Sequence, residues 1–224
     1  MAAIGITGGI ATGKTSFTNC LREVLAERPS EVLGERTPPR DPPAAARFYD
    51  ADIAARELVN DNPEVRRLLE AEFGKEVFEG GRDLNRGRLR SIVFADVEKK
   101  RALEQILHPR IRRQWSLEAE GHRNSTKLFF ADIPLLYETG GETLCDAVVV
   151  VACSPRVQLE RLLSRSRLEE SEAQRMIDAQ MSLTEKISRA NHVVWNNGGT
   201  EVLKEQARLL IGLWRNGRGG NTAG

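Results

Sequence analysis

The chain has 224 residues, a length at which one domain or two can bury a large core. It carries 33 basic and 32 acidic side chains, and this balance argues against binding of nucleic acid or anionic membranes through a basic surface. No stretch approaches the roughly 18 apolar residues of a transmembrane helix, and no signal peptide is visible. Three cysteines at unrelated spacings fit reduced thiols better than a disulfide framework or a zinc site. We therefore expect a cytoplasmic protein without nucleic-acid or membrane partners.

Five short apolar runs predict strands. They are Ala2–Thr7, Ala46–Tyr49, Lys127–Ile133, Asp146–Cys153 and His192–Trp195. Several are continuously apolar, especially Ala147–Val151 within the fourth, as expected for strands that are covered on both faces of a parallel sheet. Longer segments with helical spacing separate the runs, and Ser154 is expected to cap a helix that starts at Pro155. Alternating strands and helices indicate an α/β fold with a five-stranded parallel sheet.

The uneven spacing of the runs suggests inserted segments. The interval between the second and third strands exceeds what one crossover helix requires, which suggests a helical insert. A charged segment near the C-terminal third is either an ordinary solvated helix pair or a mobile lid that carries arginines. The expected parts are a core (1–52, 126–160 and 190–215), a helical insert (53–125), a lid (161–189), a proline-rich loop (29–43) and a flexible tail (216–224).

The most informative segment runs from Gly8 to Thr15 and satisfies the P-loop pattern G-x-x-x-x-G-K-[ST]. Its glycines let backbone N–H groups turn toward phosphate oxygens, and the helix that follows adds its positive end. Lys14 would reach the β- and γ-phosphates and is expected to be solvated in the empty loop, while the Thr15 hydroxyl would ligate Mg²⁺. The expected nucleotide contacts are Gly8, Gly9, Ile10, Ala11, Thr12, Gly13, Lys14, Thr15 and Ser16.

The P-loop alone does not define the reaction, but two GTPase strings, D-x-x-G and N-K-x-D, are absent from the chain. A small-molecule kinase is therefore favoured over a nucleotide-dependent switch, and the alternative to any nucleotide site is a glycine-rich turn. Asp50 and Asp52 follow the second strand, where one could accept a proton from an attacking hydroxyl and the other could organise water around Mg²⁺. One of them, Asp52 above all, could instead cap the helix starting at Ile53. Asp132 ends the third strand as in a Walker B motif.

These motifs, in this order, resemble those of the dephospho-CoA kinases, and the resemblance extends from Ile4 to about Leu213. Its residues are Thr7–Thr15, Asp50-Ala51-Asp52 with Arg56, Leu107-His108-Pro109, Ile133-Pro134-Leu135-Leu136-Tyr137-Glu138, and Arg161 and Arg165 with Gln180. The resemblance implies a three-layer P-loop fold with a helical acceptor-binding insert and a lid. It also implies phosphorylation of the ribose 3′-hydroxyl of dephospho-CoA with ATP and Mg²⁺, which completes coenzyme A. A kinase of another small hydroxyl acceptor is the alternative.

The resemblance also implies residue roles. Asp52 matches the catalytic base, and Lys14 and Arg161 would complete the catalytic set. Arg165 and Asn196 would contact ATP. The remaining positions would bind the acceptor, and they are Asp50, Arg56, His108 and Asp132.

The Leu-His-Pro element leaves a structural question open. Pro109 disfavours helix at His108, which predicts a break between two helices with Pro109 at the first position of the second. His108 is either a substrate contact or a purely structural cap. Of the two oligomeric states considered, a monomer is favoured over a trimer.

Overall fold

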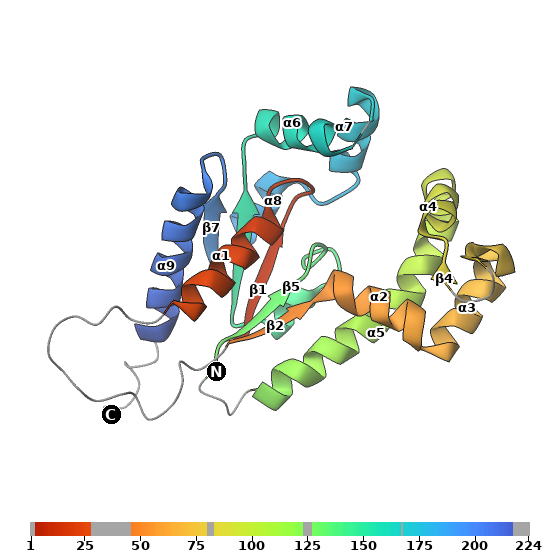
Figure 1. Ribbon diagram of the computed structural model, residues 1–224, viewed down its shortest axis with the longest axis horizontal. Helices are drawn as coiled ribbons and strands as arrows, with labels where there is room; N and C mark the ends of the chain where they lie inside the picture. Colours follow the sequence, from red (N-terminus) through yellow and green to blue (C-terminus); the bar gives the residue numbers. More distant parts are fainter. Residues whose placement is uncertain (1–2, 28–45, 80–82, 123–126, 167, 217–224) are drawn as a thin grey trace, which may run out of the picture. The chain divides into compact units, whose positions relative to one another are not determined.

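The computed structural model describes residues 3–27, 46–79, 83–122, 127–166 and 168–216 (Figure 1). The predicted loop at 29–43 and all of the predicted tail except Asn216 lie outside these residues. The chain divides into two compact units. We call Met1–Phe48 with His122–Gly224 the sheet unit and Tyr49–Gly121 the helical unit. The functions that the sequence assigns to the parts of the chain stay predictions.

The sheet has five strands in the order β2-β5-β1-β6-β7. They are β1 (Ala3–Gly8), β2 (Arg47–Asp50), β5 (Phe129–Asp132), β6 (Ala147–Ala152) and β7 (His192–Trp195). Strand β1 pairs in parallel with β5 and with β6, and β6 pairs in parallel with β7. All five predicted strands form, and the α/β fold is confirmed. The central position of β1 places the P-loop, which follows it directly, at the carboxyl end of the sheet.

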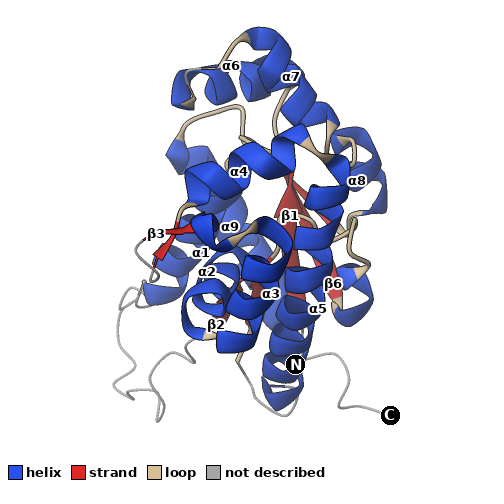
Figure 2. Cartoon of the chain, turned by 90° about the vertical axis from the view of Figure 1, so that its right-hand side faces the viewer, coloured by secondary structure: helices blue, strands red, loops and turns tan. Residues whose placement is uncertain are grey.

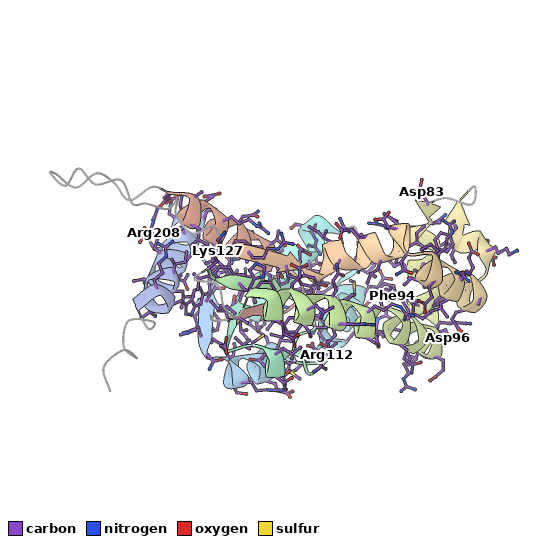
Figure 3. The ribbon with its side chains drawn as sticks, turned by 90° about the horizontal axis from the view of Figure 1, so that it is seen from below. Asp83, Phe94, Asp96, Arg112, Lys127 and Arg208 are labelled. Carbon is purple, nitrogen blue, oxygen red and sulfur yellow. The ribbon has the colours of Figure 1, made fainter. Side chains whose placement is uncertain are left out.

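Two helices cover one face of the sheet. Helix α1 (Lys14–Ala26) and helix α9 (Thr200–Asn216) lie side by side in Figure 1. Their apolar residues pack on those of the strands in one cluster, which includes Ile4, Ile6, Phe17, Leu21, Phe130, Val149, Val151, Leu203, Ala207 and Trp214. Arg208, labelled in Figure 3, joins α9 to Glu27 at the end of α1 with Nη2–Oε1 3.1 Å. The C-terminal end of α1 is thereby tied to α9.

The opposite face is covered by the segment after β5 and by α8 (Leu183–Arg189), which packs on β6. The fit is close at Gly5, where a Cβ would lie 2.7 Å from Cδ2 of Leu136 and 2.8 Å from Sγ of Cys145. The sheet unit therefore has three layers. Ser154 caps α6 (Pro155–Arg165) as predicted, because its Oγ accepts from the Val157 N–H at 3.4 Å. Helix α7 (Glu170–Asp178) and the short helix η2 (Gly141–Leu144) complete this unit.

The helical unit has its own small core. Its elements are α2 (Ala51–Asp61), α3 (Pro63–Phe73), η1 (Lys75–Val77), β3 (Phe78–Glu79), β4 (Asp83–Leu84), α4 (Arg86–Ala95) and α5 (Val97–His122). The buried residues include Val65, Leu69 and Val77. The β3–β4 pair, of which β3 is marked in Figure 2, was not predicted, because strands of two residues carry no periodicity. Among the described residues, no helix combines the length and apolar character needed to cross a bilayer.

The predicted helix break at Pro109 is wrong, since α5 continues through it from Val97 to His122. Proline in a helix interior removes one backbone hydrogen bond and crowds the preceding turn, at about 3 kcal/mol. Packing on both sides outweighs that penalty. Leu103 and Leu107 contact the core of the helical unit, and Trp115 is buried further along. Tertiary burial thus decides the conformation here.

Because Pro109 is exposed, its replacement should relieve the penalty without creating a cavity. We expect Pro109→Ala to raise the free energy of unfolding by about 1–3 kcal/mol, measured by urea denaturation. Glu120→Ala, at an exposed position of the same helix, should change it by less than about 0.5 kcal/mol and serves as the control. A lower stability of Pro109→Ala would mean that the proline ring itself stabilises this part of α5.

Candidate phosphate-binding site

Helix α1 begins without a side-chain cap. Its N-cap residue is Gly13, in the left-handed conformation with φ 90° and ψ 28°, and no described side chain accepts a cap hydrogen bond there. The side chains of Thr15 and Ser16 in the first turn are exposed. The backbone N–H groups of this turn are therefore left for an external acceptor, and the helix dipole favours an anion at the same place. This is the geometry of a phosphate site.

Gly13 is required for two reasons, its positive φ and its contact with Asn196. A Cβ at this position would overlap Nδ2 of Asn196. We expect Gly13→Ala to reduce ATP affinity at least about tenfold and to lower the Tm, because either the loop or Asn196 must move. Calorimetric titration with ATP and thermal unfolding measure the two effects. Gly212→Ala in α9 is the matched control, since a Cβ there meets nothing within 4 Å. Unchanged affinity in Gly13→Ala would contradict the phosphate-site assignment.

Lys14 is not solvated, contrary to the expectation from the sequence. Its Nζ forms an ion pair with Oδ1 of Asp132, and the side chains are 15% and 4% exposed. Oδ2 of Asp132 accepts from the Thr18 hydroxyl at 2.8 Å. The pairing follows from register, because Ile6 of β1 lies beside Asp132 at the end of β5, next to where the P-loop starts. A phosphate that binds the Lys14 ammonium group must therefore displace the buried Asp132 carboxylate.

Side chains from outside the P-loop hold its backbone. Nε2 of Gln158 on α6 donates to the Ile10 carbonyl at 2.8 Å, and the Ile10 N–H donates to Oε1 of Gln180 at 2.9 Å. Nδ2 of Asn196, after β7, donates to the Thr12 carbonyl at 2.9 Å. The predicted contact of Asn196 with ATP stays a prediction, and the amide is already used to hold the loop. Gln158 was not predicted, because nothing in the sequence relates it to a loop so far away.

Arg161 lies against the same loop. Its Nη1 is buried without a hydrogen-bond partner among the described residues, and it is 3.8 Å from where a Gly13 Cβ would be. Burial raises the pKa of the neighbouring Cys153 thiol, and both the charge of Arg161 and a side-chain hydrogen bond from it oppose that shift. A buried unpaired guanidinium N–H is unfavourable, and a phosphate oxygen would satisfy it. Arg165, one turn further, is exposed at the end of α6.

The aspartate pair lies in the helical unit, where the structure separates the two roles that the sequence left open. Helix α2 begins at Ala51, and Oδ1 of Asp50 accepts from the N–H groups of Asp52 and Ile53 at 2.9 Å and 3.0 Å. The cap is therefore Asp50, and the interpretation of Asp52 as the cap is wrong. Asp52 lies in the first turn with an exposed side chain, and Arg56 follows one turn on, also exposed.

The helical unit also contains a pocket of about 580 Å³ between α2, the start of α3 and the middle of α5. Both signs of charge line it, with Glu57 and Asp61 on one side and Arg110 and Arg113 on the other. Arg110 is held by Glu64, Nη2–Oε1 2.8 Å. His108 is half-buried in α5, where burial lowers its pKa and Glu104 opposes the shift. The histidine is therefore biased toward its neutral form.

The side chains near the P-loop suit Mg²⁺ rather than a metal ion whose ligands all come from the protein. Among the described residues, no group of three or more His, Cys, Asp or Glu side chains could hold an ion. Mg²⁺ usually keeps several waters and takes one or two protein oxygens together with phosphate oxygens. The exposed Thr15 hydroxyl supplies one such oxygen next to Lys14. The residues present fit that mode of binding.

Comparisons with known proteins identify the family of the chain. The family model for dephospho-CoA kinase matches residues 44–201, which leaves the P-loop at 8–15 as an independent observation. A dephospho-CoA kinase from Bacillus cereus is 36% identical over 213 residues, covering 94% of this chain and 96% of its own.

Two solved structures share the fold. TT1252 from Thermus thermophilus has a TM-score of 0.68 and 32% identity, covering 94% of this chain and 96% of its own. A dephospho-CoA kinase from Campylobacter jejuni has a TM-score of 0.68 and 22% identity, with 96% and 98% covered. The chain belongs to the dephospho-CoA kinase family.

Proposed function

We propose that this chain transfers the γ-phosphoryl group of ATP to the ribose 3′-hydroxyl of dephospho-CoA, giving coenzyme A and ADP. One observation carries the proposal beyond family membership. The start of α1 and the Nη1 of Arg161, both without a side-chain partner among the described residues, lie beside Gly13, so that two kinds of unsatisfied donor are close together. Donors held ready for a developing negative charge are the main catalytic device of phosphoryl transfer.

The roles follow from the contacts. Backbone N–H groups of the P-loop and of the first turn of α1 would bind the β-phosphate, except those of Ile10 and Thr12, which already donate to Gln180 and to the Gly9 carbonyl. Lys14 would leave Asp132 to contact the β- and γ-phosphates. Arg161 would stabilise the charge that spreads over the γ-phosphoryl oxygens in the transition state. Thr15 would hold Mg²⁺, which when bound neutralises charge on the β- and γ-phosphates. Once freed from Lys14, Asp132 could orient water around that ion.

The acceptor side of the proposal rests on the helical unit. Asp52, whose carboxylate is not used as a cap, would accept the proton of the 3′-hydroxyl, and Arg56 would attract the acceptor phosphates. The mixed charges of the pocket in this unit suit a long acceptor that has polar amide groups as well as phosphates. Asp50 and His108 would contribute contacts, and Arg165 and Asn196 would contact ATP.

The proposal also includes the compartment and the oligomeric state of the enzyme. We place the enzyme in the cytoplasm because its three free thiols suit a reducing compartment, and we expect a monomer rather than a trimer. The near balance of 33 basic and 32 acidic side chains supports small-molecule partners rather than nucleic acid or membrane. Analytical ultracentrifugation measures the oligomeric state.

The test is turnover of the purified protein with ATP, Mg²⁺ and dephospho-CoA, followed by the mass of the product. We expect the acceptor to gain one phosphate and its 3′-carbon to show phosphorus coupling by NMR. Nucleosides and other small alcohols serve as competing acceptors. If one of these is phosphorylated and dephospho-CoA is not, the kinase assignment stands but the acceptor is wrong.

A further inference from the structure

Lys186 of α8 is a buried charge that the roles above do not use. Its side chain is 0% exposed, and its Nζ contacts three oxygens: the Gly8 carbonyl at 3.2 Å, the Pro134 carbonyl at 3.0 Å and Oε1 of Glu138 at 2.8 Å. Glu138 also accepts from the Met181 N–H at 3.1 Å. The ammonium group therefore joins β1, the segment after β5, and α8.

Stability alone does not account for a lysine at this place. Removing an ammonium and a carboxylate from water is unfavourable, and apolar residues of similar volume often replace such pairs without loss of stability. Burial lowers the pKa of Lys186, while the hydrogen bond and charge of Glu138 oppose the shift and the charge of Lys14 adds to it. What the ammonium supplies, and an apolar side chain cannot, is three donors aimed at three fixed oxygens.

The bond to Gly8 belongs to a repeated pattern along the P-loop. The carbonyls of Gly8, Ile10 and Thr12 are held in turn by side chains outside the loop. The donors are Lys186, Gln158 and Asn196. In a planar trans peptide the C=O and the following N–H point in opposite directions. Holding these three carbonyls therefore directs the next N–H groups, those of Gly9, Ala11 and Gly13, away from the holding side chains.

We propose that Lys186 is a positioning residue for ATP binding, which holds the Gly8 carbonyl on the outer side of the P-loop so that the loop is preset to receive phosphates. The inference deepens the proposed function and rests on it. In this proposal Glu138 neutralises Lys186, so that no unpaired charge is left beside the P-loop. Gln180 and Lys186 together tie the C-terminal part of the segment 161–189 to the P-loop.

The first variant is Lys186→Met, which keeps the length of the side chain and removes its donors. We expect the Kd for Mg·ATP, measured by calorimetric titration, to rise at least about tenfold, since misplacement by about 1 Å can cost about 100-fold. The KM for dephospho-CoA should stay within about twofold, because the acceptor does not use the loop. Lys204→Met in α9, which breaks pairs to Glu23 and Glu27 at the end of α1 and does not contact the P-loop, is the matched control and should leave both constants unchanged.

Glu138→Gln keeps the accepting oxygen and removes the charge. It therefore tests the role of Lys186 even if Lys186→Met does not fold. Without that anion Lys186 loses its proton at a lower pH, and a neutral amine has only two donors. Glu138 and Lys14 are the charged groups acting on it. We expect the ATP affinity of Glu138→Gln to fall between about pH 7 and about pH 9.5 more steeply than that of the unaltered protein.

Three outcomes separate the explanations. Folded variants that bind ATP with the unaltered Kd at every pH overturn the proposal. A lower Tm with equal increases in both substrate constants also overturns it, because that pattern describes a residue that is only structural. If the unaltered protein itself does not bind ATP, the proposed function fails rather than the role of Lys186.

Discussion

Lys14→Ala is expected to lower kcat at least about 100-fold, and also to lower the stability of the ligand-free protein. The first effect follows because the substitution removes a cation that would stabilise the negative charge developing on the transferred phosphoryl group. The second follows because Asp132, whose side chain is 4% exposed, loses its ion-pair partner. Leaving a buried acceptor without its donor costs about 1–3 kcal/mol. Steady-state kinetics and urea denaturation measure the two effects.

The double variant with Asp132→Asn separates stability from catalysis. An amide at position 132 needs no cation, so the double variant should recover most of the stability while its kcat stays low. Lys204→Ala, which breaks a pair between α9 and Glu27 away from the P-loop, controls for the loss of a lysine. A Lys14→Ala variant with unaltered kcat would reject the P-loop assignment. One with low kcat and full stability would mean that the ion pair contributes little to the ligand-free fold.

The pair between Lys14 and Asp132 also bears on the charge balance of the chain. The formal net charge is +1, and the two lysines nearest the P-loop, Lys14 and Lys186, are each neutralised by a carboxylate. An anion therefore meets unsatisfied N–H groups and Arg161 before it meets a free lysine. Binding of phosphate exchanges one partner of Lys14 for another, and the affinity reflects the difference between them.

The elements that the sequence predicts well are those whose signal is local. Short apolar runs identified all five strands, and the spacing of Gly8, Gly13 and Lys14 identified the P-loop. Ser154 followed by Pro155 identified the start of α6. Each of these patterns is contained within a few residues, and burial or hydrogen bonding acts on the same few residues.

What the sequence could not predict depends on contacts between distant segments. Lys186 lies far along the chain from Gly8, and its neighbours are ordinary for a surface helix. Pro109 predicts a helix break locally, and only the packing on both sides of it keeps α5 continuous. The cap at Asp50 rather than Asp52 is a shift of helix start by two residues, which composition cannot resolve because either aspartate suits a cap.

That shift makes the role of Asp52 testable on its own. Because Asp50 accepts the two cap hydrogen bonds, the Asp52 carboxylate can be removed without loss of the cap. If Asp52 is the base, Asp52→Asn should lower kcat by about 100- to 10,000-fold, since an amide cannot accept the proton of the attacking hydroxyl. The KM for ATP should stay within about twofold. The loss of stability should not exceed about 0.3–1 kcal/mol, the value of a carboxylate at a helix start.

Asp50→Ala provides the contrast, because it removes the cap and should destabilise the protein by about 1 kcal/mol in urea denaturation. Asp83→Asn, at an exposed carboxylate of β4 labelled in Figure 3, controls for the loss of a charge elsewhere in the helical unit. If Asp52→Asn keeps its kcat, the base lies elsewhere. If Asp50→Ala instead lowers kcat far beyond its effect on stability, the Asp50 carboxylate also takes part in the reaction.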